Sequence, residues 1–230
     1  MNILITGASR GIGREIAKQF ALIEGNRVVA LSRNEARLTE LKSECETINR
    51  GSQLIPLALD LTTDNLKGEL YAMMEDEFDH LDVLVNNAGV LVNKPFVELE
   101  AEDVEKVFNT NLFSVIKLIQ LLLPLMGKDS KTSIVNIGSM GGYQGSEKFT
   151  GLSAYSASKG ALSTLSECLA KEFEGMNINV NCLALGGVNT EMLSQAFPGY
   201  KAEVNPEQIA AYIVDFCTGH VISCSTWNVN

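Results

Sequence analysis

Residues 2–13 read NILITGASRGIG, an apolar run followed at once by a glycine-rich turn. The apolar run has the aliphatic composition of a buried strand. Gly7, Gly11 and Gly13 permit a tight turn, let a diphosphate approach the backbone, and let the next helix pack close to the strand. The first N–H groups of that helix would face the phosphates. The segment therefore predicts a strand–turn–helix unit that binds a dinucleotide, rather than a glycine-rich turn without a ligand.

The rest of the chain alternates short apolar runs with longer segments of helical period, which is the pattern of a parallel sheet covered by helices. The sequence predicts strands at 2–6, 27–31, 53–59, 83–86, 133–137, 179–183 and 226–229. Helices are expected at 12–23, 35–48, 64–78, 101–123, 153–173 and 206–217, and residues 186–205 read as a loop or short-helix lid. We therefore expect an α/β fold: a Rossmann-like, doubly wound, seven-stranded parallel sheet with helices on both faces, in a single domain spanning residues 1–230.

Composition narrows the function classes. The 230 residues are 46% hydrophobic and 20% charged, as in a packed globular protein, and the net charge of −10 argues against nucleic acid and membrane surfaces as partners. Five widely spaced cysteines and two histidines predict neither a disulfide framework nor a metal site. The most apolar stretch, 115–126, is interrupted by Lys117, Gln120 and Pro124, so no membrane span is expected. Because the N-terminus shows no basic leader, we expect a reducing, cytoplasmic setting.

The end of the second predicted strand bears on the choice of cofactor. An acidic residue there would bind the adenosine 2′-hydroxyl of NAD, but Ser32 stands at that position and Arg33 follows it. Arg10 lies inside the glycine-rich turn. Two guanidinium groups suit a 2′-phosphate, so the sequence favours NADP(H), although either arginine alone could be a solvated surface charge.

The segment YSASK places Tyr155 and Lys159 four residues apart on a predicted helix, so that both side chains lie on one face. A free tyrosine has a pKa near 10 and is a poor acid or base at neutral pH unless a neighbouring cation stabilises the phenolate. Lys159 can supply that charge. The pair therefore predicts proton transfer by Tyr155, against the alternative of an ordinary helix-surface pair.

The glycine spacing GxxxGxG, the tetrapeptide NNAG at 86–89, Ser139 and the Tyr155–Lys159 pair together resemble the short-chain dehydrogenase/reductase family, over essentially the whole chain. The resemblance implies hydride transfer between NADP(H) and a small carbonyl or alcohol substrate, with Tyr155 as general acid/base. It also implies that Ser139 hydrogen-bonds the substrate oxygen, that Lys159 contacts the nicotinamide ribose, and that Asn111 holds a proton-relay water. A homodimer or homotetramer is expected, paired through the helices that contain Asn111 and Tyr155.

The resemblance also assigns cofactor-binding positions. Asp60 matches an aspartate that contacts adenine, although a helix N-cap or turn residue is an equal interpretation. NNAG is expected first to steady the central sheet and second to line the cofactor, and Val188 and Thr190 match positions that contact the nicotinamide carboxamide. The predicted cofactor-binding residues are Gly7, Ser9, Arg10, Gly11, Ile12, Gly13, Ser32, Arg33, Asp60, Leu61, Asn87, Ala88, Gly89, Tyr155, Lys159, Gly186, Val188 and Thr190.

Two segments depart from the family pattern or shape the pocket. Residues 140–153 form a somewhat long loop that is expected to make one wall of the substrate pocket. After the sixth strand, Leu185-Gly186 stands where the family usually shows Pro-Gly. Residues 191–205 contain Met192, Leu193, Phe197 and Tyr200 and one lysine, which favours a neutral or partly apolar substrate over a phosphorylated one, unless these side chains simply pack the loop.

Other functions stay open on the same fold. The chain could be a catalytically idle NADP(H)-binding sensor or scaffold, although the complete set Asn111, Ser139, Tyr155 and Lys159 argues against that. An enoyl reductase would space its tyrosine and lysine more widely, and an epimerase of the extended type would need a longer chain.

Overall fold

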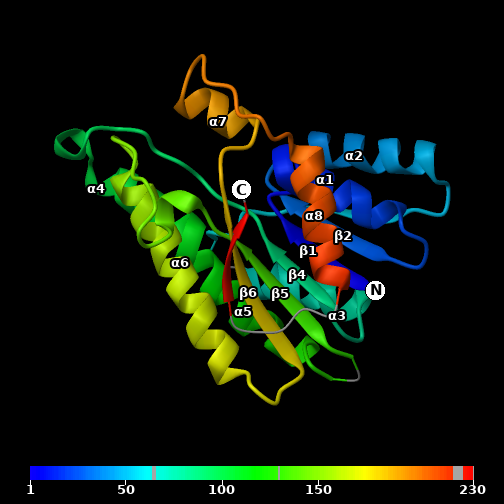
Figure 1. Ribbon diagram of the computed structural model, residues 1–230. Helices are drawn as coiled ribbons and strands as arrows, with labels where there is room; N and C mark the ends of the chain where they lie inside the picture. Colours follow the sequence, from blue (N-terminus) through cyan, green and yellow to red (C-terminus); the bar gives the residue numbers. More distant parts are fainter. Residues whose placement is uncertain (64–65, 129, 220–224, 230) are drawn as a thin grey trace.

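The protein is built on a parallel sheet, shown edge-on among its helices in Figure 1. The structure, a computed structural model, describes residues 1–63, 66–128, 130–219 and 225–229. Six strands form the body of the sheet in the order β3-β2-β1-β4-β5-β6, and β7 pairs with the outer edge of β6; every neighbouring pair is parallel. The strands are β1 (Asn2–Thr6), β2 (Arg27–Ser32), β3 (Gln53–Ala58), β4 (Val83–Asn86), β5 (Thr132–Ile137), β6 (Ile178–Leu185) and β7 (Ser225–Val229).

Helices cover both faces of the sheet, which explains why the strands are apolar along their whole length. Ile3 and Ile5 of β1 pack in one core cluster, and Leu4 between them packs in the cluster on the opposite face. The first cluster lies under α1 (Gly11–Leu22), α2 (Glu35–Ile48) and α8 (Pro206–Thr218), and the second under α3 (Ala72–Glu77), α5 (Ser114–Leu122) and α6 (Ser153–Glu172). The predicted doubly wound α/β fold is confirmed.

The predicted helix 101–123 is wrong in one respect, because the structure interrupts it. α4 (Ala101–Phe108) passes into a π-helical turn, η3 (Asn109–Phe113), before α5 begins. The wider turn carries Asn111 inward, where its Oδ1 accepts a hydrogen bond from Val90 N at 2.8 Å and its Nδ2 donates to Val90 O at 3.0 Å. These two bonds to the backbone of the β4–α4 loop account for the local departure from α-helix, a departure that often marks functional positions.

The whole helical run Ala101–Leu125 is long and apolar enough to cross a membrane by length and composition alone. Its most apolar part nevertheless packs inside the protein, because Val115, Leu118 and Leu122 belong to the core under the sheet. Packing within the fold therefore accounts for its apolar character.

Two other predicted segments differ in detail. The helix expected at 64–78 contains a π-helical turn, η1 (Lys67–Tyr71), before α3, and residues 64–65 lie outside the described residues. The segment 186–205 contains a short helix, α7 (Glu191–Ala196), and a bridge between Val188 and Val204 that holds its two ends together. Short 3-10 turns complete the fold: η2 (Phe96–Glu98), η4 (Leu123–Leu125) and η5 (Met140–Gly142).

Candidate active site

A cleft of about 1200 Å³ opens at the carboxyl ends of the strands, where parallel sheets of this topology bind ligands. It passes over the glycine-rich turn between β1 and α1 and reaches α7, the helix that stands above the strands in Figure 1. Of the predicted cofactor-binding residues, Gly13 alone does not line the cleft. Of the four predicted catalytic residues, Ser139, Tyr155 and Lys159 line it, whereas Asn111 lies behind Gly89.

Hydrogen bonds between the ends of β1 and β4 fix the floor of the cleft. Asn87 N and Ala88 N both donate to Thr6 Oγ1 at 3.0 Å, and Asn87 Nδ2 donates to Thr6 O at 3.0 Å and to Gly7 O at 3.3 Å. A Cβ atom on Gly13 would lie 2.2 Å from Asn87 Nδ2. Gly13 is therefore required for packing of α1 against the NNAG segment, and its part in any cofactor site is indirect.

The start of α1 leaves its backbone donors available to the cleft. α1 begins at Gly11 without a side-chain cap from any residue that the structure describes, and its first turn carries no acidic side chain. In contrast, Asn34 Oδ1 caps α2 by accepting from Arg37 N at 3.0 Å. An uncapped helix start that opens on a cleft is suited to an anion, because its N–H groups and the helix dipole both favour negative charge.

Ser139 and Tyr155 meet although they lie on different elements. Ser139 follows β5 and caps η5, where its Oγ accepts from Gly141 N at 3.1 Å. Tyr155, in the first turn of α6, is partly buried; burial raises the pKa of its phenol, and a hydrogen bond with Ser139 opposes that rise. A Cβ atom on Gly142 would lie 2.6 Å from Lys159 C, so the glycine allows η5 to approach α6 closely. This close approach brings the hydroxyl of the strand end to the phenol.

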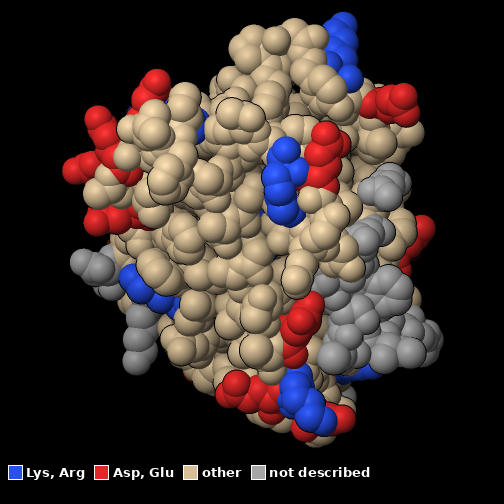
Figure 2. Space-filling view, turned by 60° about the vertical axis from the view of Figure 1, so that its left-hand side comes forward, with Lys and Arg blue, Asp and Glu red and all other residues tan. Residues whose placement is uncertain are grey.

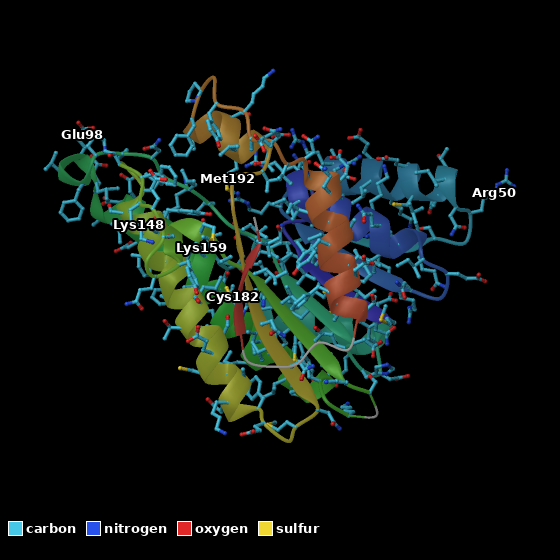
Figure 3. All side chains as sticks on the ribbon, in the orientation of Figure 1. Arg50, Glu98, Lys148, Lys159, Cys182 and Met192 are labelled. Atoms are coloured by element: carbon cyan, nitrogen blue, oxygen red, sulfur yellow. The ribbon has the colours of Figure 1, made fainter. Side chains whose placement is uncertain are left out.

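Lys159 lies one helical turn after Tyr155 and is almost fully buried, with 4% of its surface exposed. Its Nζ donates to Ile137 O at 2.7 Å, at the end of β5. Burial lowers the pKa of the Lys159 ammonium to about 8. Cys182, on the neighbouring β6, is also buried, which raises the pKa of its thiol to about 11 and keeps it neutral at physiological pH (Figure 3). The site therefore holds one buried amine that titrates close to neutrality, a property often found at functional sites.

The side chain of Asn111 makes three hydrogen bonds within the protein. Besides its two bonds to Val90, its Nδ2 donates to Ser158 Oγ at 3.0 Å, and Ser158 Oγ donates to Tyr155 O at 2.7 Å. Its Oδ1 would be 3.4 Å from a Cβ atom on Gly89, and Lys159 Nζ would be 3.7 Å from the same atom. The structure thus places Asn111 beside Lys159, behind the loop that follows β4.

The opposite end of the cleft, where β2 ends, we call the β2 end; it is lined by Arg10, Ser32, Arg33, Glu35, Arg37, Asp60 and Glu191. Arg33 Nη1 lies 3.9 Å from Asp60 Oδ2, and 72% of the arginine side chain is exposed. Asp60 Oδ1 also accepts from Thr62 N at 2.9 Å and from Thr62 Oγ1 at 2.8 Å, as in the turn interpretation of this residue. Ser32 Oγ accepts from Asn34 N at 3.2 Å.

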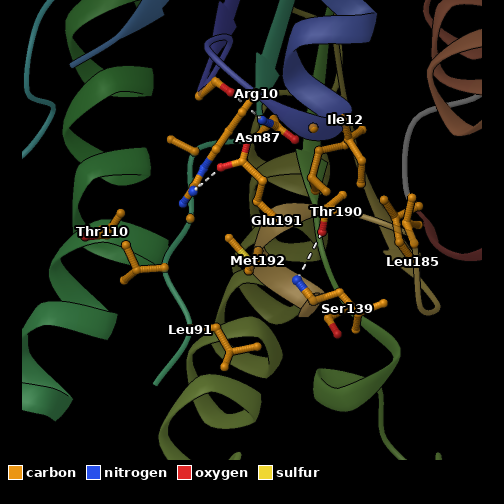
Figure 4. Close-up of a pocket in the computed structure, with 18 of the residues that line it drawn as sticks. Arg10, Ile12, Asn87, Leu91, Thr110, Ser139, Leu185, Thr190, Glu191 and Met192 are labelled. Carbon is orange, nitrogen blue, oxygen red and sulfur yellow. Dashed lines mark hydrogen bonds and ion pairs between the residues drawn. The ribbon is translucent and has the colours of Figure 1, made fainter. Parts of the chain in front are cut away.

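Sequence reasoning missed Arg37, which joins the β2 end from the first turn of α2. Its Nη1 lies 3.1 Å from Glu191 Oε1, and Arg10 Nη1 lies 2.9 Å from Glu191 Oε2 (Figure 4). Arg37 lies in the first turn of the helix predicted to begin at residue 35, directly after the second strand, so the sequence could have placed it near the end of β2. The contact with Glu191 carries no local signal, because it joins segments 154 residues apart.

The far end of the cleft, beyond Ser139 and Tyr155, is apolar. Phe149 and Phe197 meet edge to face with ring centroids 6.4 Å apart, joining the loop after β5 to the segment after α7. The predicted wall 140–153 thus contributes to the cleft through Met140, Gly141, Phe149 and Leu152. The residues that we call the apolar end are Leu91, Met140, Phe149, Leu152, Met192, Leu193, Phe197 and Tyr200.

Across the described ranges, no group of three or more His, Cys, Asp or Glu side chains is arranged to hold a metal ion.

The depressed pKa of Lys159 predicts a dependence of stability on pH. The pKa of Lys159 is 10.5 in the unfolded chain and about 8 in the folded chain, so between these values the unfolded chain binds the proton and the folded chain does not. The contribution of Lys159 to the free energy of unfolding therefore increases as the pH is raised from about 8 to 10.5 and is lost as the pH is lowered again. At about 1.4 kcal/mol per pKa unit, the change is about 3 kcal/mol. Urea unfolding measures the free energies of unfolding of the unsubstituted protein and of Lys159→Met. As the pH is raised across this range, the unsubstituted protein should gain stability relative to Lys159→Met by this amount. A difference that stays constant over this pH range would contradict the buried titration.

Comparison with known proteins gives the cleft a family context. The family model for the short chain dehydrogenases matches residues 1–201. The 3-oxoacyl-(acyl-carrier-protein) reductase of Thermotoga maritima is 32% identical, over 95% of this chain and 94% of its own length. The fatty acyl-CoA reductase of Acinetobacter baylyi is 35% identical, over 92% of this chain and 70% of its own length.

Solved structures agree with this assignment. L-sorbose reductase of Gluconobacter frateurii, in complex with NADPH and L-sorbose, matches with a TM-score of 0.87 at 26% identity, over 100% of this chain and 94% of its own. A candidate short chain dehydrogenase of Shigella flexneri, in complex with NADP, matches with a TM-score of 0.87 at 31% identity, over 99% and 95% of the two chains. The chain therefore belongs to the short chain dehydrogenase family and is an oxidoreductase of that family.

Proposed function

We propose that the protein is an NADP(H)-dependent oxidoreductase that interconverts a carbonyl and an alcohol. The observation that carries the proposal is the meeting of Ser139, Tyr155 and Lys159 in one cleft with the glycine-rich turn. A hydroxyl, a phenol and a buried amine in this arrangement can bind a carbonyl oxygen and exchange a proton with it.

The residues of the cleft fit NADP(H) along its length. The uncapped start of α1 can hold the diphosphate, and the arginines of the β2 end can hold a 2′-phosphate. Lys159 and the segment from Gly186 to Thr190 would line the nicotinamide nucleoside, close to Tyr155. Solved relatives in complex with NADP or NADPH add support for this choice of cofactor.

Bound NADP(H) would supply or accept the hydride, and the protein would manage the proton. In reduction, Ser139 holds the substrate oxygen while Tyr155 donates its proton to that oxygen; in oxidation Tyr155 takes the proton back. Burial disfavours the phenolate that remains, so the positive charge of Lys159 is needed to stabilise it. With a pKa of about 8, Lys159 is mostly charged at neutral pH.

In our proposal Asn111 is a positioning residue for Ser139, Tyr155 and Lys159. Its bonds to Val90 and Ser158 hold the loop after β4 against the first turn of α6. The relay water assigned to Asn111 by family resemblance stays a prediction of the same proposal.

The substrate that suits the apolar end is a neutral carbonyl compound with an apolar chain or ring. Among the described residues that line the cleft, the cationic ones are Arg10, Arg33, Arg37 and Lys159, so the apolar end offers no guanidinium to a phosphate or carboxylate. Phe149, Phe197 and Leu152 instead offer apolar surface whose burial favours an apolar group.

The proposal is tested by NADPH oxidation over a panel of ketones, aldehydes and quinones that pairs neutral apolar members with carboxylated or phosphorylated ones. We expect turnover with the neutral apolar members, followed as loss of NADPH absorbance. NADPH binding without turnover on every member would favour the alternative, a catalytically idle sensor or scaffold.

Tyr155→Phe separates chemistry from binding. The change removes the proton donor and leaves the ring that packs in the cleft, so kcat should fall by roughly 10²-fold or more, while the Kd for NADPH stays within about twofold. Stopped-flow kinetics and NADPH fluorescence titration measure the two quantities. Tyr143→Phe, a tyrosine outside the cleft lining, is the matched control, and a Tyr155→Phe protein that keeps most of its rate would defeat the assignment.

We also propose that the protein pairs with itself through the side that carries α4 and α6. Phe96, Val97 and Phe113 are exposed there, with 77%, 91% and 46% of their surfaces accessible. Figure 2, with this side turned forward, shows a mostly uncharged face; acidic side chains gather at its left edge, and others are scattered at the centre, the right and the bottom. Light scattering should give two or four times the chain mass of 24.9 kDa, and Phe113→Asp should lower it. A monomeric mass for the unsubstituted protein would contradict the pairing.

A further inference from the structure

One carboxylate spans two arginines across the β2 end of the cleft. Glu191 Oε2 lies 2.9 Å from Arg10 Nη1 and 3.2 Å from Arg37 Nη1, and Glu191 Oε1 lies 3.1 Å from Arg37 Nη1. Arg10 comes from the glycine-rich turn, Arg37 from α2, and Glu191 is the first residue of α7. Two ion pairs therefore tie the start of α7 to the wall of the cleft.

The contact lies over the glycine-rich turn itself. Thr190, next to Glu191, caps α7 by accepting from Leu193 N at 3.2 Å, and its Cγ2 would be 3.2 Å from a Cβ atom on Gly11. Figure 4 shows Glu191 reaching Arg10 beside the turn. The carboxylate thus occupies the region between the start of α1 and the start of α2, on the side of the cleft where β2 ends.

Charges at the β2 end cancel while Glu191 is seated there. The cleft lining at this end contains three cationic side chains, Arg10, Arg33 and Arg37, and three acidic ones, Glu35, Asp60 and Glu191. Without the Glu191 carboxylate the same lining carries one positive charge in excess. An incoming phosphate group is therefore attracted more strongly to this end once Glu191 has left it.

Guanidinium groups bind carboxylates and phosphates through the same planar pairs of N–H donors. The two arginines that converge on Glu191 are consequently arranged for a phosphate as well. Arg10 and Arg37 are each 42% exposed, whereas Arg33 is 72% exposed and pairs loosely with Asp60. Arg10 and Arg37 make the more enclosed of the possible anion sites at this end.

We propose that Glu191 competes with the 2′-phosphate of NADP(H) for Arg10 and Arg37, which makes Arg37 and Glu191 specificity-determining residues for the cofactor. The inference rests on the proposed use of NADP(H). A dinucleotide without the 2′-phosphate gains nothing by displacing Glu191, because it offers the arginines no anion at that position. Seating of the 2′-phosphate frees the start of α7, and α7 also carries Met192 and Leu193 of the apolar end.

The test compares two fragments that differ in the 2′-phosphate alone, adenosine 2′,5′-bisphosphate and AMP, by isothermal titration calorimetry on the full chain. Glu191→Gln keeps the size of the side chain and removes its charge, so it should tighten the bisphosphate by about 3- to 10-fold and change AMP by less than about twofold. Arg37→Gln should weaken the bisphosphate by about 10-fold. In the double variant the gain from Glu191→Gln should largely disappear, because the competing contact has been removed.

Matched controls carry the same charge changes elsewhere. Glu203→Gln changes an exposed carboxylate in the segment that follows α7, and Arg50→Gln changes an exposed arginine far from the cleft (Figure 3). Both should leave the ratio of the two dissociation constants unchanged. Thermal unfolding by circular dichroism confirms that each variant is folded.

The outcomes separate this inference from the proposed cofactor. If the unsubstituted protein prefers the bisphosphate and Glu191→Gln leaves that preference unchanged or weakens it, the competition is overturned and the use of NADP(H) stands. If neither protein prefers the bisphosphate, both the competition and the proposed cofactor are overturned.

Discussion

The bonds between Thr6 and the NNAG segment are the constraint on which the cleft depends. β1 and β4 are neighbours in the sheet, yet the chain leaves them toward opposite faces, because α1 covers one face and the connection to α5 covers the other. Thr6 Oγ1 and Asn87 Nδ2 tie the two departing segments together. These bonds therefore hold the two segments at a fixed separation where the cleft lies between them. The turn at Gly7 lines one side of the cleft and the loop at Gly89 lines the other.

A second constraint concerns the amine at the centre of the site. Burying Lys159 costs free energy whenever it is charged, and the bond from Nζ to Ile137 O offsets part of that cost. That bond also fixes the first turns of α6 against the end of β5, which is where Ser139 follows. Lys159, whose burial costs free energy, is thus also the residue that aligns the helix carrying Tyr155 with the strand end carrying Ser139.

Much of the architecture was predictable because burial on both faces leaves a direct record in sequence. β1 and β4 begin and end at the predicted residues, since each is an apolar run bounded by polar or turn residues. Tyr155 and Lys159 could also be chosen by spacing and type, whereas the choice of Ser139 rests on family resemblance. What escaped prediction depends on tertiary contacts. A π-helical turn needs no proline or glycine, so the segment 101–123 shows no helix-breaking residue and reads as one helix. The pairing of Glu191 with Arg10 joins residues 181 positions apart.

The π-helical turn η3 has a geometric effect on the helices it joins. One residue added to a helical turn rotates everything beyond it by about 100° relative to a continuous α-helix. Beyond the turn, Leu118 and Leu122 of α5 pack in the core under the sheet, whereas Val104 of α4 and Phe113 of the turn itself remain 36% and 46% exposed. The one extra residue of this turn thus has two effects: the amide of Asn111 points inward, and apolar side chains remain on the outer surface.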